Sequence, residues 1–374
     1  MKKILIASAV SAIFAAPATV LAQAKPAPVP TLDKILEASG ISVSGYIDAG
    51  YTHADRNIEA GIPVGSLTPA AERVFDNQNN SFALHQFGLT VAKQPKEGFG
   101  GLVNITAGKD AQVIASTGAA VSQVDLTQAF LQYAGGPLTV IAGKFVTLSG
   151  TEVIASPGNN NVSRSILFGA IPFTHTGVRA TWALSDTVSL IAGVNNGWDQ
   201  LTDQNKGKTV ELGATLNPIK PLSIVLSGYS GKEGVSPAEG TRTSLNAVAS
   251  YTIIDPLSVG LEVLSVSNDI PGAGGTTTKA KYSGVAGYVS YMFAPKFRGV
   301  VRFESFDDKD GFHFGTAGTK YKEATLTGAY LASDSFEARV EARRDSATKT
   351  VFTDYAGAAS KTMTSIALQG LYKF

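Results

Sequence analysis

The residue types that most often perform catalysis or bind metals are few and scattered in this sequence. The four histidines, His53, His85, His175 and His313, show neither an HExxH motif nor the close spacing of metal ligands. The chain has no cysteine, which excludes thiol catalysis, disulfides and cysteine-ligated metals. His175 could serve as the base of a serine hydrolase, but no nucleophile can be paired with it. The sequence therefore predicts no catalytic, cofactor-binding or metal-binding residues, and we expect that the protein is not an enzyme.

Charged side chains follow a clearer pattern, because they alternate with apolar ones. Between residues 336 and 343, four charged residues occupy every second position and Phe or aliphatic residues occupy the others. Successive side chains of a β-strand point to opposite faces, so this segment has one charged face and one apolar face. A strand between water and lipid has two such faces. The same phase along the chain predicts a set of pore-lining residues: Asp48, Arg179, Glu211, Glu262, Arg302, Glu304, Glu337, Arg339, Glu341 and Arg343.

The alternation recurs from Ile41 to the end of the chain. Segments of about ten residues are separated by breaks that alternate between short and long, as transmembrane β-barrels require. The long breaks lie near residues 54–80, 107–121, 148–173, 196–207, 232–242, 267–281, 307–321 and 345–361. They predict about sixteen strands. We expect an all-β fold, a closed antiparallel transmembrane β-barrel with short periplasmic turns and long extracellular loops.

One segment departs from the regular pattern. Within residues 81–92, the apolar residues Phe82 and Leu84 fall on the opposite phase from Phe87, Leu89 and Val91. The alternation therefore slips by one residue inside this predicted strand.

The N-terminal residues resemble a secretory signal. Lys2 and Lys3 precede an apolar, Ala-rich stretch, and small residues before Gln23 suit cleavage at that point. We expect residues 1–22 to be a cleaved signal peptide, with an uncleaved anchor as the alternative. No later stretch approaches the roughly 20 apolar residues that a spanning helix needs, so a membrane role would depend on strands.

Residues 23–40 are predicted to be a Pro-rich lead-in that ends in a short helix. Thr31 could cap this helix and Gly40 could end it. The segment is either a periplasmic lead-in to the first strand or a small plug or partner-binding helix. Residues 41–374 are then the barrel.

The third long break, Leu148–Phe173, has an unusual composition for a loop. It contains Glu152, Arg164 and the apolar patch Ile166-Leu167-Phe168, which needs burial. One hypothesis is that this loop folds into the barrel and narrows it, with Glu152 and Arg164 in the constriction. The alternative is an external loop that makes trimer contacts.

Aromatic residues recur just before the short turns, on the apolar face of their strands. Such rings sit well at a membrane interface and would form a girdle there. The predicted girdle consists of Tyr133, Trp182, Tyr251, Tyr291, Tyr330, Tyr372 and Phe374. The amphipathic last strand, which ends on Phe374, resembles the signal by which the barrel-assembly machinery recognises outer-membrane proteins.

Several segments together resemble a known family. They include Gly45–Tyr51, Gly143–Glu152, Ser163–Phe168, Pro172–Arg179 and Val194–Asp199, and the resemblance extends over essentially the whole mature chain. These segments are similar to the OmpL-like β-barrel porins. The resemblance implies an outer-membrane channel without assigned catalytic residues, and it implies no particular solute.

The sequence as a whole predicts a porin of the Gram-negative outer membrane, exported through the periplasm. We expect a water-filled channel for passive diffusion of small hydrophilic solutes and ions. A solute-specific channel, an outer-membrane barrel enzyme and a soluble all-β propeller are the alternatives. The expected partners are outer-membrane lipid, the barrel-assembly machinery, small polar solutes and, by analogy with large porins, two further copies in a trimer. The net charge of +1 gives no reason to expect a nucleic-acid partner.

Overall fold

The computed structural model describes residues 31–58, 73–116, 122–236 and 238–374. The predicted signal peptide, residues 1–22, and most of the lead-in lie outside these ranges. The helix expected before the barrel is α1 (Leu32–Ser39), with Thr31 before it and Gly40 after it. Gly40 has a φ of 67°, a left-handed conformation that glycine adopts without strain and that commonly ends a helix. Among the described residues, no helix is long and apolar enough to cross a membrane.

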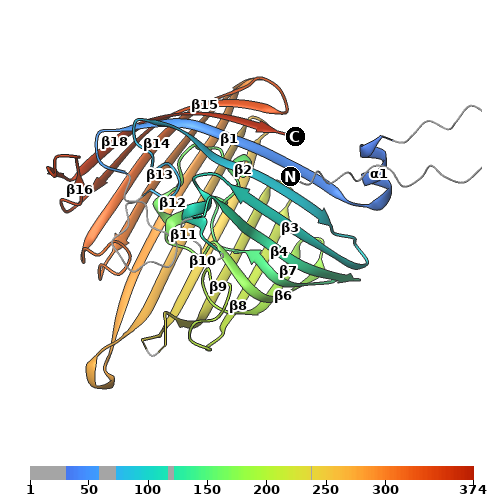
Figure 1. Cartoon of the computed structure of the whole chain (residues 1–374), viewed down its shortest axis with the longest axis horizontal. Coiled ribbons are helices and arrows are strands. Elements are labelled where there is room, and N and C mark those ends of the chain that lie inside the picture. The colour runs from blue at the N-terminus through green and yellow to red at the C-terminus, as the bar shows by residue number, and fades with distance from the viewer. Residues whose placement is uncertain (1–30, 59–72, 117–121, 237) are drawn as a thin grey trace, which may run out of the picture.

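Sixteen strands form one closed barrel, each antiparallel to the next (Figure 1). In chain order the first eight are β1 (Ser42–Ala54), β2 (Ser81–Lys93), β3 (Gly98–Ala107), β4 (Val124–Gly135), β5 (Leu138–Val146), β6 (Thr174–Ser185), β7 (Val188–Asn195) and β8 (Thr209–Ile219). The other eight are β9 (Leu222–Glu233), β10 (Gly240–Ile254), β11 (Leu257–Pro271), β12 (Thr277–Ala294), β13 (Phe297–Asp308), β14 (Thr319–Leu331), β15 (Phe336–Ala347) and β18 (Thr362–Lys373). β1 pairs with β18, which closes the barrel and leaves no unpaired edge. The prediction of a closed antiparallel barrel is confirmed.

The connections differ at the two ends of the barrel. At one end, the turn end, strands are joined by two to four residues, as between β4 and β5. At the other end, the loop end, most connections are longer. Loop 3, defined as residues 147–173 between β5 and β6, contains the short helices η1 (Ser156–Gly158) and α3 (Ile166–Gly169). The other short elements are α2 (Ala111–Ile114), η2 (Ala273–Gly275) and the hairpin β16 (Phe352–Thr353)–β17 (Ala359–Ser360).

The β11–β12 connection differs from its predicted length. The sequence predicts a long loop over residues 267–281, but β11 continues to Pro271 and β12 begins at Thr277. The two strands thus form a long hairpin that projects from the loop end, at the lower left of Figure 1. The predicted break at residues 232–242 is likewise shortened by pairing of Lys232 with Thr241.

The phase slip within residues 81–92 corresponds to a β-bulge. Asp48 pairs with Gln86 and the next residue, Ala49, pairs with Leu84, so His85 is the extra residue. Both His85 and Gln86 are buried, whereas Leu84 and Val91 are 51% and 41% exposed on the outer face. The bulge therefore keeps the apolar residues on both sides of it facing outward.

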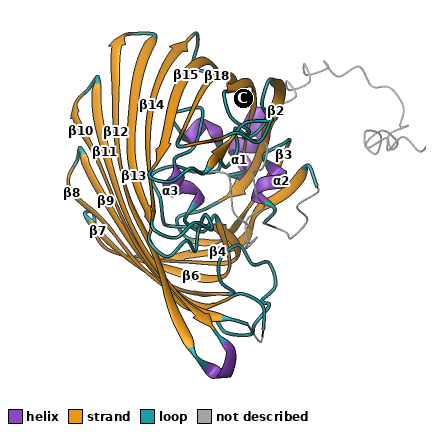
Figure 2. Cartoon of the chain, turned by 90° about the vertical axis from the view of Figure 1, so that its left-hand side faces the viewer, coloured by secondary structure: helices purple, strands orange, loops and turns teal. Residues whose placement is uncertain are grey.

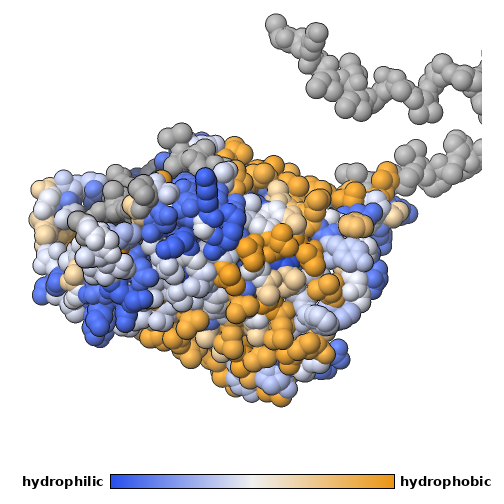
Figure 3. Space-filling model, turned by 90° about the horizontal axis from the view of Figure 1, so that it is seen from below, coloured by the Kyte–Doolittle hydropathy of each residue, from blue (hydrophilic) through white to orange (hydrophobic). Residues whose placement is uncertain are grey.

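The outside of the barrel is apolar. Seen from below, hydrophobic residues gather over the wall toward the turn end, and hydrophilic residues gather at the loop end (Figure 3). Exposed Leu, Val, Ile and Phe side chains occur on nearly every strand. A soluble protein rarely shows so large an apolar surface, whereas a barrel that spans a membrane requires one.

Candidate functional site

Strand β15 has apolar side chains on the outer face of the wall and charged side chains on the inner face. Val340 is 51% exposed, while its neighbours Arg339 and Glu341 are 4% and 2% exposed. The side chains therefore alternate between the lipid-facing surface and the barrel interior. All ten charged residues that the sequence assigns to the interior are buried there, and none is more than 7% exposed.

Loop 3 covers most of these interior charges. After β5, Gly150 N donates to Asn246 Oδ1 (3.0 Å) on β10 and Thr151 N donates to Glu262 Oε2 (2.9 Å) on β11. Farther along, Ser156 Oγ donates to Asp48 Oδ2 (2.5 Å) on β1. Figure 2, which looks toward the loop end, shows the loops and α3 within the ring of strands. Loop 3 thus runs across the interior from one wall to another.

Two glutamates on the wall accept backbone N–H groups of loop 3. Glu341 accepts from Val162 N (2.7 Å) and Ser163 N (2.9 Å). Glu304 accepts from Ile166 N (2.7 Å) and Leu167 N (2.6 Å) at the start of α3. Hydrogen bonds from backbone N–H to a carboxylate are stronger than neutral ones, and each carboxylate here holds two adjacent peptide groups.

Three arginines on the wall donate to backbone carbonyls of the same loop segment. These are Arg339 to Asn161 O (3.2 Å), Arg302 to Ser163 O (2.9 Å) and Arg343 to Arg164 O (2.6 Å). The wall therefore satisfies both donors and acceptors within residues 161–167. Of the two placements considered for this loop, inside the barrel or outside it, the structure has the first.

Glu152 and Arg164 hold loop 3 in shape. Glu152 forms an ion pair with Arg302 (2.6 Å) and accepts from Ser165 N (2.6 Å). Arg164 is 1% exposed, donates to the carbonyls of Val153 (3.0 Å) and Ile154 (2.9 Å), and packs against aromatic rings. Burial lowers the pKa of the Arg164 guanidinium, although Glu152 opposes this effect. Neither side chain is open to bulk water.

The described parts of the first two loops also lie inside the barrel, which sequence reasoning missed. Arg73, in the loop after β1, is 2% exposed and donates to Asp345 Oδ2 (3.0 Å) and Ser365 Oγ (2.7 Å) on the wall. Residues of three loops then pack together with Phe173 in one apolar cluster: Val74, Phe75, Val113, Ile114, Ile154 and Phe168. The apolar pattern of residues 166–168 was the one signal for this cluster in the sequence.

A second apolar cluster fills the interior at the loop end. It joins Leu167 and Ile171 of loop 3 to inward-facing Tyr282 and Phe306 of the wall, with Phe314 from the loop after β13. The sequence predicts a polar interior, and this part of it is not polar. The difference arises because inward loops bury wall side chains that would otherwise contact water.

The predicted aromatic girdle lies on the outer surface. Its members are exposed by 36% to 55%: Tyr133, Trp182, Tyr251, Tyr291, Tyr330, Tyr372 and Phe374. Rings that the sequence analysis did not select extend it, since Phe99 packs against Tyr133 (5.0 Å between centroids) and Phe297 packs against Tyr330 (5.1 Å). Aromatic rings at this level suit a membrane interface.

The two buried histidines, His175 and His85, contact neighbouring residues of the fold. His175 is fully buried, its Nδ1 lies 3.0 Å from Gly197 O, and its ring stacks on Tyr229 with centroids 4.5 Å apart. His85 Nδ1 lies 3.5 Å from Asp110. Within the described ranges, no group of three or more His, Asp or Glu side chains could hold a metal ion.

Comparison with known protein families gives one match over most of the chain. Residues 40–374 match the family described as "Putative beta-barrel porin-2, OmpL-like". The chain belongs to this family. This OmpL-like porin therefore forms a channel of the outer membrane, and its family and fold are those of a channel rather than of an enzyme. Comparison with curated proteins gives no significant match.

Solved structures share the fold of the OmpL-like porin at low sequence identity. The outer membrane channel DcaP of Acinetobacter baumannii has a TM-score of 0.62 and 14% identity, over 89% of this chain and 97% of that one. In vitro folded OmpT of Vibrio cholerae, in a trimer form, has a TM-score of 0.58 and 12% identity, over 89% and 99%. An anion-selective porin of Comamonas acidovorans has a TM-score of 0.59 and 10% identity, over 89% and 99%.

Proposed function

We propose that this OmpL-like porin lets small hydrophilic solutes and ions diffuse passively across the outer membrane, with loop 3 as the constriction. The long loops would face the cell exterior and the short turns the periplasm. The observation that supports this function is the hydrogen bonding of residues 161–167 to wall carboxylates and guanidinium groups inside the barrel. A loop held inside the barrel in this way would narrow the channel, and the strands of the wall would not have to move.

Removal of the loop tests the constriction. Replacement of residues 153–162 by a short Gly/Ser linker should raise single-channel conductance in planar bilayers by about twofold or more. A second variant, Asn161→Cys/Thr327→Cys, keeps the loop in place. Asn161 Nδ2 lies 2.7 Å from Thr327 Oγ1 on β14, so cysteines at these two positions are within reach of a short bifunctional thiol cross-linker. The chain has no other cysteine to compete.

The two variants together give a clear result. The cross-linked double-cysteine variant should conduct like the wild type, because the loop already lies against β14 in the open channel. A shortened loop that leaves conductance unchanged would contradict the constriction. A cross-link that abolishes conductance would mean that loop 3 must leave this position before ions pass.

The interior charges support weak ion selectivity. Most cations of the wall are neutralised by an adjacent acid, as in Arg179–Glu211 (2.7 Å), Arg302–Glu323 (2.9 Å) and Arg343–Asp345 (2.7 Å). Paired charges cancel at a distance, and wall acids that bind loop 3 N–H groups, such as Glu304 and Glu341, leave a modest negative field along the lumen. Reversal potentials in asymmetric KCl should therefore give a K⁺/Cl⁻ permeability ratio within about a factor of three of one.

A solute-specific channel is the second candidate, and Arg242 favours it. This inward-facing residue of β10 holds its guanidinium 4.8 Å from the Trp198 ring and 5.3 Å from the Phe312 ring. It has no ion pair within 4 Å among the described residues, and its Nε donates to Asn268 (3.0 Å). Saturable block of the current by benzoate, lost in Arg242→Gln, would select this candidate over free diffusion.

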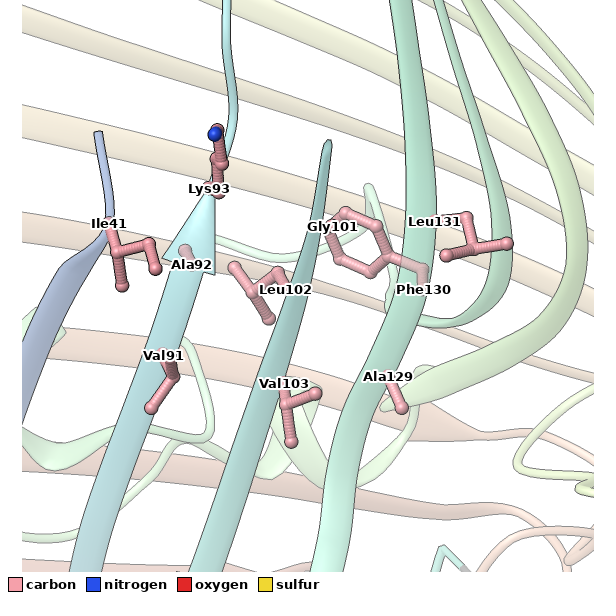
Figure 4. Close-up of a pocket in the computed structure, with 10 residues that line it drawn as sticks. All are labelled: Ile41, Val91, Ala92, Lys93, Gly101, Leu102, Val103, Ala129, Phe130 and Leu131. Atoms are coloured by element: carbon pink, nitrogen blue, oxygen red, sulfur yellow. The ribbon is translucent and has the colours of Figure 1, made fainter. Parts of the chain in front are cut away.

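Export and assembly complete the proposal. The OmpL-like porin would lose residues 1–22 on export, insert through the barrel-assembly machinery by β18, and form a trimer. Strands β2–β4 offer a surface for a second copy, since a hollow of about 510 Å³ lies at Gly101 there. Figure 4 shows apolar side chains of neighbouring strands around it, with Lys93 at one edge. Val103 lines this hollow and is 45% exposed, so Val103→Trp should convert detergent-extracted trimers to monomers in native electrophoresis.

A further inference from the structure

Two cations on the outer surface of β14 and β15 have no partner among the described residues. Lys322 and Arg344 are exposed, while the adjacent Glu323 and Asp345 face the interior and are buried. Neither cation has a hydrogen bond or ion pair from its side chain within the described ranges. The neighbouring Lys320 differs, because it pairs with Asp307 at 3.4 Å.

The strand register brings these two cations together. Arg344 pairs with Ala324, so Lys322 lies two residues farther along β14 on the same outer face. Diagonal neighbours of this kind lie roughly 7–8 Å apart, and their Cβ atoms are somewhat closer. Like charges so placed repel each other, and an anion between them would remove that repulsion.

Hydroxyl groups surround this pair. Thr364 on β18 is paired directly with Arg344, and Ser305 on β13 is paired directly with Lys322. Ser346 follows Arg344 on the same face of β15. An ammonium group, a guanidinium group and nearby hydroxyls are the donors that bind a phosphate group. The acid Asp55 shares this surface, and its carboxylate accepts from Thr364 N (2.8 Å).

The apolar surface begins directly below the cations. Phe303, Leu326 and Ile366 are 61%, 60% and 53% exposed on β13, β14 and β18, two to four residues toward the turn end. A ligand seated here would place its charged group on the cations and its hydrocarbon on these side chains. A free phosphate ion would contact only the cations and hydroxyl groups of such a site, and not its apolar side chains.

The opposite wall lacks this arrangement. On β9 and β10, the first polar outward residues beyond Leu226 and Leu245 are Ser230 and Thr243, which hydrogen-bond to each other (3.0 Å). The cationic pair on β14–β15 therefore has no counterpart at this level of β9–β10.

We propose that Lys322 and Arg344 bind the phosphate of a phosphorylated glycolipid in the outer leaflet, whose acyl chains lie on the apolar surface below. This site lies outside the pore, and the choice of lipid rests on the orientation proposed above, with the long loops at the cell exterior. The lipid would fix the depth and rotation of the barrel at that leaflet.

Lipid A provides the probe. Full-length protein in detergent is titrated with diphosphoryl lipid A, and binding is followed by native mass spectrometry. The proteins compared are the wild type, the double variant Lys322→Gln/Arg344→Gln and the control Lys232→Gln. Lys232 is an exposed lysine on β9. We expect the double variant to bind lipid A about tenfold or more weakly, and the control to bind like the wild type. Heat-modifiable electrophoretic mobility and bilayer conductance should be unchanged in all three, because the pore is untouched.

Three outcomes would overturn the proposal. The first is equal lipid A affinity in the wild type and the double variant. The second is an equal loss in Lys232→Gln, which would indicate attraction to any surface cation. The third is competition by inorganic phosphate at the same concentration as lipid A, which would indicate a simple anion site. Arg344→Lys, which keeps the charge, should retain most of the affinity.

Discussion

Arg302 on β13 and Glu152 in loop 3 form an ion pair inside the barrel, with Nη1 and Oε1 2.6 Å apart. Arg302 also pairs with Glu323 on the neighbouring β14 (2.9 Å) and is fully buried. One guanidinium thus connects two wall strands to a loop 150 positions away in the sequence. The position of loop 3 depends on this buried charge network.

Loss of the Arg302 charge should therefore release loop 3. Arg302→Gln leaves Glu152 and Glu323 buried without this cation, and removal of one partner of a buried ion pair costs about 3–5 kcal/mol. We expect a lower thermal unfolding temperature in detergent and a noisier, larger single-channel current. The control Lys281→Gln removes an exposed lysine and should change neither. An Arg302→Gln channel as stable and quiet as the wild type would refute a structural role for the pair.

The carboxylate of Glu341 offers a milder way to loosen the loop. In Glu341→Gln, one acceptor oxygen becomes an NH₂ group that faces a backbone N–H of Val162 or Ser163. An unmet buried N–H costs about 1–3 kcal/mol. Amide hydrogen exchange of residues 160–165 should rise tenfold or more, with conductance raised or unsteady.

Glu97 provides the matched control for that experiment. It accepts Gly136 N (3.1 Å) in an exposed turn, where water replaces a lost acceptor. Glu97→Gln should leave exchange in loop 3 and conductance as in the wild type. Equal protection of residues 160–165 in wild type and Glu341→Gln would mean that other contacts hold the loop.

The wall of this barrel could be predicted from sequence because each side chain of a strand faces either the outer surface or the barrel interior. On β15, Val340 contacts the outside and Glu341 the inside, and a period of two follows directly. Even the phase slip near His85 was visible, since a bulge shifts the whole later pattern by one residue.

Strand ends were harder to predict. At residues 267–281, Ile270 is the one large aliphatic side chain and the other positions on both faces of the β11–β12 hairpin are Pro, polar or small, so the pattern is that of a loop. Beyond the membrane, no lipid selects apolar side chains on one face. The pairing of Asp269 with Lys279 therefore gave no periodic signal.

The interior of the site could be predicted only in part. Periodicity indicated the inward direction of Glu304 and Arg302, and composition indicated the need to bury Ile166–Phe168, but neither indicated their mutual contacts. Those contacts join residues more than a hundred positions apart, and local periodicity contains no information on them. The inward path of Arg73 had no signal in its own segment.

The contact between Gly45 and Phe374, where β1 pairs with β18, should affect how well the barrel assembles. Gly45 N donates to Phe374 O and Phe374 N donates to Gly45 O, both at 2.9 Å, and a Cβ on Gly45 would collide with the Phe374 ring. Gly45→Val should displace this ring from the β1–β18 seam, at a cost of about 1–3 kcal/mol for overpacking. We expect a smaller folded fraction, measured as heat-modifiable mobility after refolding into detergent.

Gly370 on β18 allows a matched comparison. A Cβ there would have ordinary contacts, the closest at 3.9 Å from the Phe336 ring. Gly370→Val should refold like the wild type. If Gly45→Val also refolds to the wild-type extent, the fit of Phe374 over Gly45 does not matter for closure.

The pH dependence of stability should depend on Asp199, which lies outside the strands in the loop after β7. Its Oδ1 accepts Phe173 N (2.9 Å) and Thr174 N (2.8 Å), so it joins the end of loop 3 to this second loop. Burial raises the pKa of the Asp199 carboxyl from 3.8 to about 7, although the two N–H donors oppose the shift. The folded protein therefore binds a proton more tightly than the unfolded chain.

The sign of the effect follows from this shift. The contribution of Asp199 to stability is greatest below pH 4, declines as the pH rises from about 4 to about 7, and is lowest above pH 7, where the carboxylate is ionised in both states. The wild type should lose on the order of 2–3 kcal/mol from this residue between pH 5 and pH 8. Thermal unfolding in detergent at the two pH values measures the loss.

Asp199→Asn isolates the titration. Asn keeps an acceptor oxygen for both N–H groups and tolerates the left-handed φ of 56° at this position. We expect this variant to be more stable than the wild type at pH 8 and to show a smaller difference between pH 5 and pH 8. Asp255→Asn, in an exposed turn, should keep the wild-type difference. If the Asp199→Asn difference is as large as that of the wild type, another group is responsible for the pH dependence.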